Sequence, residues 1–180
     1  MPPATKPLLH TTIASPLGEL LLLGDGEALH GLYMQRGRKP GTVPSGRREP
    51  DAFAAVSTQL SEYFAGRRTS FDLALELTGT PFQLRVWRAL REIGYGETLS
   101  YAELARRIGR PSASRAVGAV NGSNPISIVV PCHRLVGTSG ALTGYAGGVE
   151  AKRSLLDFEA KRIGAAELSP AEDRPMHRAV

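Results

Sequence analysis

The segment Pro131-Cys132-His133-Arg134 places a thiol directly beside an imidazole. Cys132 is the only cysteine of the 180 residues, and no acidic residue follows it before Glu150. A thiolate is stabilised by neighbouring positive charge and can be generated by an imidazole base. Neighbouring side chains of an extended strand point to opposite faces, so the two groups cooperate only where the strand ends or where a water molecule bridges them. The segment indicates a nucleophilic cysteine, and the plainer alternative is a buried, unreactive one.

The rest of the sequence argues against several other kinds of chemistry. A single cysteine rules out a disulfide within the chain and a cysteine-rich zinc site. We expect no metal site. No glycine-rich phosphate loop follows a predicted strand, which also argues against a bound cofactor. The longest apolar run, Leu20 to Leu23, is far shorter than the roughly 20 residues of a membrane span. The N-terminal segment lacks the apolar core of a signal peptide, which predicts a cytoplasmic protein without membrane contact.

Positive charge is concentrated in the second half of the chain. Lys and Arg number 22 against 17 Asp and Glu, which gives a net charge of +5. Between Glu103 and Glu150 there is no acidic residue, whereas the same stretch contains Arg106, Arg107, Arg110, Arg115 and Arg134. This distribution favours a polyanionic partner, most commonly nucleic acid. A solvated basic face is the alternative.

Three helices are predicted around this basic stretch, two of them from capping signals. Residues 80–83 (TPFQ) combine a Thr cap, a proline at the first helical position and a Gln three residues after the cap. Residues 100–103 (SYAE) form a second capping box, and a third helix spans about 113–121 after a tight turn. The last two helices predict a helix-turn-helix. Because the third helix carries mainly small side chains, we expect it to read DNA shape and phosphates in a narrow groove rather than base sequence.

The first half predicts a small layer of strands and one helix. Asp25-Gly26 between two apolar runs predicts a hairpin, and Gly37 to Pro50 reads as a loop. A helix follows Asp51, with an apolar face formed by Phe53, Val56, Leu60 and Phe64. Residues 71–77 (FDLALEL) alternate as a half-buried strand does.

These elements predict an α+β protein of two domains. We expect an N-terminal antiparallel sheet-plus-helix domain at residues 1–78 and a mainly helical domain at 79–163. Residues 164–180 read as a flexible tail. In the second domain, an apolar strand at 126–130 is predicted to run directly into Cys132.

The second half resembles the O6-alkylguanine-DNA alkyltransferase family, also called methylated-DNA–protein-cysteine methyltransferases. The likeness rests on PCHRLVG at 131–137, with NGSNPI before it and ALTGYAGG after it, and it extends from GTPFQLRVWRAL at 79–90 to KRSLLDFE ending at Glu159. The resemblance implies a winged-helix-like helix-turn-helix domain, with the first half as a helper domain that matches only loosely. It also implies that no cofactor is needed, because the damaged base supplies the alkyl group.

The resemblance also implies roles for individual residues. Cys132 is the alkyl acceptor, His133 deprotonates it through a water molecule, and Glu159 orients His133. Asn124 is a hinge between the recognition helix and the reactive segment. Tyr101 helps to rotate the nucleotide and donates a hydrogen bond to the purine. From the residues alone, Glu159 reads as a surface acid, Tyr101 as a packing residue and Asn124 as turn chemistry.

The remaining implied positions fall into two groups. Arg115 enters the minor groove and fills the gap left by the extruded base, on a DNA-binding helix that also includes Ser114, Ala116, Gly118, Ala119 and Asn121. The substrate pocket comprises Pro131, Leu135, Tyr145, Ala146 and Lys152. Leu135, Ser114, Val120 and Gly94 depart from the residues usual in the family, which leaves the range of adducts and the approach of the helix to DNA open.

The function implied is DNA repair by direct reversal of damage. One alkyl group moves irreversibly from O6-alkylguanine in flipped-out DNA to Cys132, once per molecule, and O4-alkylthymine stays open as a second substrate. We expect a cytoplasmic, nucleoid-associated monomer that binds duplex DNA largely without sequence preference, with clustering on DNA left open. One alternative is a catalytically weak, base-flipping lesion-binding protein. A cysteine hydrolase is another, and it would turn over more than once.

Overall fold

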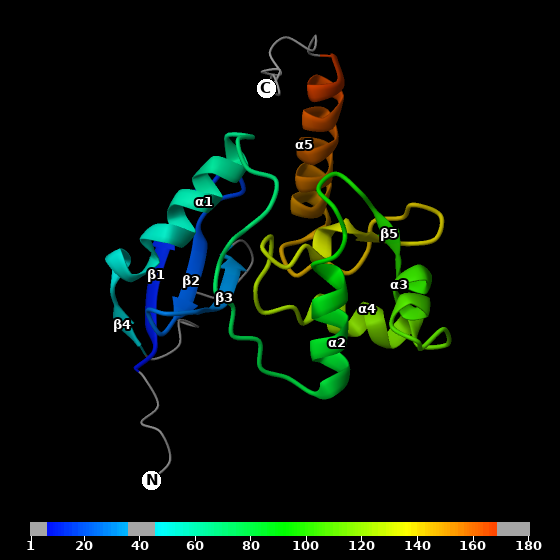
Figure 1. Cartoon of the computed structure of the whole chain (residues 1–180), viewed down its shortest axis with the longest axis horizontal. Coiled ribbons are helices and arrows are strands. Elements are labelled where there is room, and N and C mark those ends of the chain that lie inside the picture. The colour runs from blue at the N-terminus through cyan, green and yellow to red at the C-terminus, as the bar shows by residue number, and fades with distance from the viewer. Residues whose placement is uncertain (1–6, 36–45, 169–180) are drawn as a thin grey trace, which may run out of the picture.

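The computed structural model describes residues 7–35 and 46–168, with side chains placed up to residue 164. The first half forms a four-stranded sheet covered on one face by a helix, and the second half is mainly helical (Figure 1). The strands are β1 (Leu9–Ile13), β2 (Leu20–Gly24), β3 (Leu29–Met34) and β4 (Arg47–Arg48). Their order is β3-β2-β1-β4, with β1, β2 and β3 antiparallel and β4 parallel to β1. The predicted α+β class is confirmed.

The hairpin predicted at Asp25-Gly26 is confirmed as the connection between β2 and β3. The Asp25 carboxylate accepts hydrogen bonds from the amides of Glu27 and Ala28, at 2.9 and 2.8 Å. Gly26 has a φ of +90°, a conformation that favours glycine. Strand β1 had no counterpart in the prediction. Strand β4 lies within the predicted loop at 37–50, and residues 37–45 of that loop are outside the described part.

The strand predicted at residues 71–77 is wrong. The segment is extended, and its side chains alternate between exposed and half-buried as expected, but it bridges to β3 only between Leu75 and Leu29. Further along β3, the backbone of Leu32 bonds with Pro125 and Ser127 instead, at 2.9 and 3.0 Å. A segment of the second half thus occupies the edge of β3 that a longer strand would need.

Helix α1 (Ala54–Phe64) follows a short 3-10 turn at Pro50–Phe53 and lies across the sheet (Figure 1). The predicted apolar face is confirmed for three of its residues, Phe53, Val56 and Leu60, which are buried. Phe64 is only half-buried, and Tyr63 is fully buried in its place. Tyr63 lies three residues after Leu60 and seven after Val56, so the same helix face carries it inward.

The predicted helices of the second half are also confirmed. Helix α2 (Pro81–Leu90) begins with both capping-box bonds around Thr80, and α3 (Tyr101–Arg107) with both around Ser100. Helix α4 (Ser114–Gly122) packs against α3 and α2, which completes the helix-turn-helix. Strand β5 (Leu99–Ser100) pairs in parallel with β6 (Leu135–Val136). The last helix, α5 (Val149–Leu168), runs past residue 164, where the tail was expected to begin.

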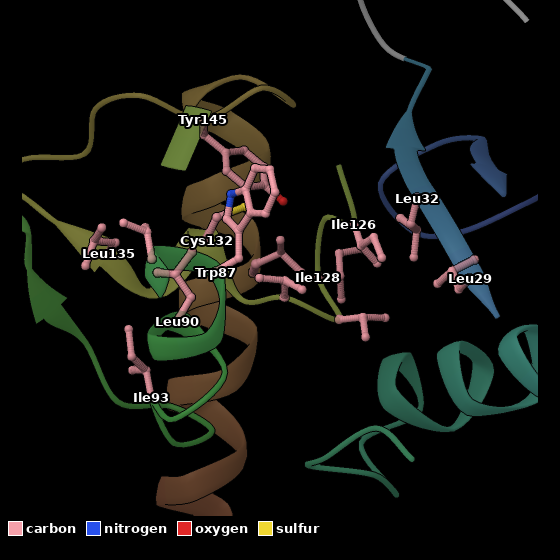
Figure 2. Packing of buried hydrophobic residues seen from close by; sticks show 14 of the residues in the cluster. Leu29, Leu32, Trp87, Leu90, Ile93, Ile126, Ile128, Cys132, Leu135 and Tyr145 are labelled. Carbon is pink, nitrogen blue, oxygen red and sulfur yellow. The ribbon is translucent and has the colours of Figure 1, made fainter. Parts of the chain in front are cut away.

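The two halves share one hydrophobic core. Leu29 and Leu32 on β3 face Ile126 and Ile128, which lead to the residues of α2 and to Cys132 (Figure 2). The second-half part of this cluster includes Trp87, Leu90, Ile93, Leu135 and Tyr145. None of the helices in the described part of the chain has the length and apolar character needed to span a membrane.

Replacing Leu32 tests whether the junction between the halves stabilises the whole protein. Its side chain is fully buried in the shared core. We expect Leu32→Ala to lower the free energy of unfolding by about 2–5 kcal/mol, the usual loss for a buried leucine. Val149→Ala is the control, since Val149 is 43% exposed. Urea unfolding measures both, and a loss no larger than that of the control would contradict a shared core.

Candidate active site

The chain reaches Cys132 through a tight turn, so the strand predicted at 126–130 is wrong. Ile128 has a φ of +71°, and the Val129 amide bonds with the Ser127 carbonyl at 2.8 Å. A left-handed conformation in a β-branched residue is strained, at a cost of about 1–3 kcal/mol. Residues 132–134 then form one turn of 3-10 helix. The extended chain therefore ends before Cys132, which is the condition under which Cys132 and His133 can cooperate.

The side chain of Asn124 holds this turn together. Its Oδ1 accepts a hydrogen bond from the Ile126 amide at 3.0 Å. Its Nδ2 donates to the Val130 carbonyl at 2.8 Å and to Cys132 Sγ at 3.0 Å. Asn124 thus lies where the resemblance placed a hinge, between α4 and the reactive segment. It also provides a donor to the sulfur itself, which favours the thiolate.

The thiol of Cys132 is protonated at neutral pH in this environment. Its side chain is only 1% exposed. Burial raises its pKa to about 11, although the hydrogen bond from Asn124 and the positive charge of Lys152 act in the opposite direction. Such a thiol attacks carbon only if a base removes its proton as the reaction proceeds.

His133 has the position and the neutral form that such a base requires. The imidazole is fully buried, and its Nε2 lies 2.9 Å from Glu159 Oε1. Burial lowers the pKa of His133 despite the adjacent carboxylate, so the ring is neutral at pH 7. With the Nε2 hydrogen directed at Glu159, Nδ1 carries the free lone pair. Nδ1 is buried and bonds with no other atom in the described part of the chain.

The carboxylate of Glu159 collects hydrogen bonds from four residues. Besides His133, Arg134 donates from Nε to Oε2 and from Nη2 to Oε1, both at 2.9 Å. The Gly96 amide donates to Oε2 at 2.9 Å, and the Tyr63 hydroxyl donates to Oε1 at 2.7 Å. Burial alone would raise the pKa of Glu159, but the bonds from His133 and Arg134 hold it well below its usual range.

Reasoning from the sequence missed two members of this cluster. Arg134 was counted only as part of the basic stretch, but it is buried and also donates from Nη1 to the Ile93 carbonyl at 2.6 Å. It supplies the positive charge that a buried carboxylate needs. Its position directly after His133 was the available signal. Tyr63 lay in a predicted helix whose inward face was assigned to Phe64 instead, and no local signal identified its partner.

A second set of bonds holds the loop that follows β6. The Tyr101 hydroxyl donates to the Thr143 carbonyl at 2.9 Å, and Lys152 Nζ donates to the same oxygen at 2.7 Å. Lys152 is fully buried, and burial lowers its pKa. Asn121 Nδ2 lies 3.3 Å from both the Gly144 and the Cys132 carbonyls. Asn121, expected on the DNA-facing side of α4, instead faces the interior because these buried carbonyls require a donor.

The outer side of α4 borders an open hollow of about 440 Å³. Its lining includes Tyr101, Ser114, Arg115, Gly118 and Thr143, but not Cys132. Arg115, Ala116 and Ala119 are exposed on the helix, in line with a surface-binding face. Val120 faces inward, and its carbonyl accepts a bond from Trp87 Nε1 at 3.1 Å, so its side chain does not set the outer face of the helix.

The residues expected to form the substrate pocket do not line one common cavity in the described structure. Tyr145 is buried near Cys132 (Figure 2), and its hydroxyl bonds with no atom of the described residues. Leu135 is fully buried in the core, and its backbone pairs with Leu99. Pro131 borders a different hollow, beside Tyr95. Ala146 is exposed on the loop.

A helix-turn-helix is typical of a DNA-binding protein, and the buried Cys–His–Glu arrangement beside it has the chemistry that a base-assisted thiol nucleophile needs. Residues 81–161 match the family model of the 6-O-methylguanine DNA methyltransferase DNA-binding domain, and residues 8–77 match that of its ribonuclease-like domain. The chain belongs to this family, as the resemblance in its sequence indicated. Its function is DNA repair by direct reversal of damage, its partner is DNA, and its activity is that of a methylated-DNA–protein-cysteine methyltransferase.

Individual relatives agree with this assignment. The methylated-DNA–protein-cysteine methyltransferase of Mycobacterium bovis is 51% identical over 156 residues, which cover 87% of this chain and 94% of the relative. The crystal structure of the Mycobacterium tuberculosis O6-methylguanine methyltransferase superposes with a TM-score of 0.83, at 48% identity, over 92% of this chain and 96% of that one. A structure of Mycobacterium tuberculosis OGT in complex with DNA gives a TM-score of 0.81, at 51% identity, over 86% and 94%.

The burial and the raised pKa of Cys132 predict slow reaction with a general thiol reagent. At about pH 7.5 we expect iodoacetamide to label the folded protein at least about tenfold more slowly than the chain unfolded in guanidinium. The rate should rise steadily with pH, because the thiolate fraction grows until the pKa of about 11 is reached. Intact-mass spectrometry measures the labelling. Equal rates for folded and unfolded protein would contradict the protonated, enclosed thiol.

Proposed function

We propose that Cys132 is the acceptor and that each molecule reacts once. The thiol proton passes through a water molecule to His133 Nδ1 while the sulfur attacks the alkyl carbon of O6-alkylguanine. The sulfur–carbon bond forms, the bond between that carbon and O6 breaks, and guanine leaves with the electron pair. The observation that carries the proposal is a thiol held by Asn124 next to a neutral His133 backed by Glu159. The thioether product does not exchange as a disulfide does, and the chain has no second cysteine.

The groups around the loop after β6 suit the leaving purine. Tyr101 and Lys152 both bind the Thr143 carbonyl, so their hydrogens lie at one place beside the site. Hydrogen-bond donors that meet a developing anion lower the barrier to its departure. We assign to Tyr101 a hydrogen bond with the purine and to Lys152 a stabilising charge. Tyr145 and Ala146 border the base in this proposal, together with Pro131 and Leu135.

The reacting oxygen lies inside the DNA stack, so the nucleotide must rotate out of the duplex. This extrusion costs a few kcal/mol. We assign to the exposed Arg115 the place of the extruded base, entered from the minor groove. The small side chains of α4 let its backbone approach the groove, and contacts of this kind depend little on sequence. Ser114, Ala116, Gly118 and Ala119 form that face of the helix.

Entry of the base requires movement of the loop. Cys132 is 1% exposed and does not border the hollow beside Tyr101 and Arg115. Bonds from Tyr101, Lys152 and Asn121 hold the loop at residues 143–144. We infer that some of these bonds break when the alkylated base enters, since the same donors then face the purine.

We also propose the organisation expected from the sequence. Residues 1–78 form a helper domain and 79–163 the reactive, DNA-binding domain, with a tail that follows. The protein acts as a monomer on chromosomal DNA, at the nucleoid. The N-terminal domain supplies part of the shared core and the Tyr63 hydroxyl.

Two other functions fit the site less well. A lesion-binding protein without transfer activity does not require a thiol supported by Asn124, His133 and Glu159. A cysteine hydrolase would release its product and turn over repeatedly. The number of turnovers therefore separates the hydrolase from the transferase, and the fate of the alkyl group separates the transferase from the binding protein.

The mass of the peptide that contains Cys132 tests the proposed reaction directly. Duplex DNA with a single O6-methylguanine is incubated with excess protein, and the mass of the tryptic peptide that contains Cys132 is measured by mass spectrometry. We expect the mass of one added methyl group and loss of the lesion, with no more than one lesion repaired per molecule. Cys132→Ala should bind the same DNA and leave the methyl group in place. An unmodified peptide with a persisting lesion would defeat the proposal.

Replacement of Arg115 tests its role in duplex DNA. Arg115→Ala should slow methyl transfer from duplex DNA by about tenfold or more, because the loss of a stabilising contact worth about 1–3 kcal/mol acts on the extruded state. Transfer from a single strand or from the free base should change little. The control is Arg153→Ala, an exposed arginine on α5. Equal slowing with all three substrates would assign Arg115 another role.

A further inference from the structure

The hydroxyl of Tyr63 reaches the reactive site from the opposite half of the protein. It belongs to α1, yet it donates to Glu159 Oε1 at 2.7 Å. The same oxygen lies 2.9 Å from His133 Nε2 and from Arg134 Nη2. Tyr63 is fully buried, with its ring centroid 5.2 to 6.0 Å from those of Phe64, Phe71, Phe158 and Tyr95. The surrounding rings leave the hydroxyl directed at one acceptor.

We propose that Tyr63 is a positioning residue of the alkyl transfer, through which the N-terminal half controls the basicity of His133. This inference rests on the proposed transfer to Cys132. The hydroxyl of Tyr63 and the ring of His133 share one carboxylate oxygen, so each competes for its electron density. The bond from Tyr63 also fixes the rotation of the carboxylate that receives the His133 hydrogen.

The direction of the effect follows from this competition. Without the hydroxyl, Oε1 accepts the Nε2 hydrogen of His133 more strongly and stabilises the imidazolium more. The pKa of His133 then rises, so the ring becomes protonated at a higher pH than in the wild type. A protonated ring cannot accept the thiol proton. Burial and the Glu159 carboxylate raise the pKa of the Tyr63 hydroxyl itself, so it remains a donor throughout the working range.

The other ionisable groups around the His133–Glu159 pair are unchanged by loss of one hydroxyl. From the 3-10 turn, α5, the segment after α2 and the loop after β6, these groups are Cys132, Arg134, Lys152, Tyr95 and Tyr145, with Arg162 beside Tyr95. Arg134 and Gly96 still donate to the carboxylate, which keeps it ionised. A change in the acid side of the pH profile can therefore be traced to the bond from Tyr63.

The experiment measures single-turnover methyl transfer from O6-methylguanine duplex DNA between about pH 5 and pH 9. For Tyr63→Phe, which keeps the buried ring, we expect the acid limb to move to higher pH by about half a unit. The plateau rate should fall about fivefold, the effect of one hydrogen bond. The control is Tyr95→Phe. Its ring packs on that of Tyr63, with centroids 6.0 Å apart, and no bond joins its hydroxyl to Glu159.

The outcomes separate this inference from the proposed function. If the wild-type protein leaves Cys132 unmodified, the transfer itself is disproved. If the wild type reacts but Tyr63→Phe gives the wild-type acid limb, Tyr63 does not act on His133. A uniform loss of rate together with a lower melting temperature, with the limb unmoved, would assign Tyr63 a packing role and overturn the inference. The same shift in Tyr95→Phe would do so as well.

A second substitution tests the inference even if the phenylalanine variant does not fold. Incorporation of 3-fluorotyrosine at position 63 keeps the hydroxyl and makes it a stronger donor, because fluorine withdraws electrons from the ring. It should draw more electron density from Glu159 Oε1 and lower the pKa of His133. The acid limb is then expected to move to lower pH, opposite to the phenylalanine variant. A shift to higher pH, or none, would contradict the shared-oxygen mechanism.

Discussion

The buried carboxylate of Glu159 sets the main requirement that this fold must satisfy. An ionised carboxyl group removed from water is stable only if its lone pairs are occupied and its charge is balanced. Arg134 supplies the balancing charge and two hydrogen bonds, and His133, Gly96 and Tyr63 supply the others. These donors come from three separate parts of the chain: α1, the segment after α2 and the 3-10 turn at residues 132–134. Folding must bring them together, so the site and the fold form as one unit.

Burial controls the ionisation of both the thiol and the imidazole beside it. Burial keeps Cys132 as a thiol and His133 as a neutral base, so neither carries a charge before the substrate arrives. A permanent thiolate would react with any small electrophile, and under the proposed single-turnover reaction each such event would inactivate one molecule. The same burial separates the sulfur from solvent, so the proposed transfer requires the loop at residues 143–144 to move when the base enters.

Two structural features are explained by the geometry of this closed site rather than by the stability of the fold. Ile128 adopts a left-handed conformation, and the turn around it is held by the side chain of Asn124. That turn ends the extended chain and begins the 3-10 turn at Cys132. In addition, the edge of β3 pairs with residues 125–127 instead of with a longer strand. The sheet of the first half thereby supports the segment that leads to the thiol.

Short-range signals in the sequence were enough to predict the local features of this protein: the Asp25-Gly26 hairpin, the two capping boxes, the helix-turn-helix, and the single thiol beside an imidazole. These signals act between residues a few positions apart, so they can be read directly. Glu159 could be named only by resemblance, since alone it reads as a surface acid. Its contacts with His133, 26 positions away, and with Tyr63, 96 positions away, arise from the packing of the whole chain. The partners of a buried charge are selected by the cost of desolvation when distant elements pack, and no local pattern records that selection.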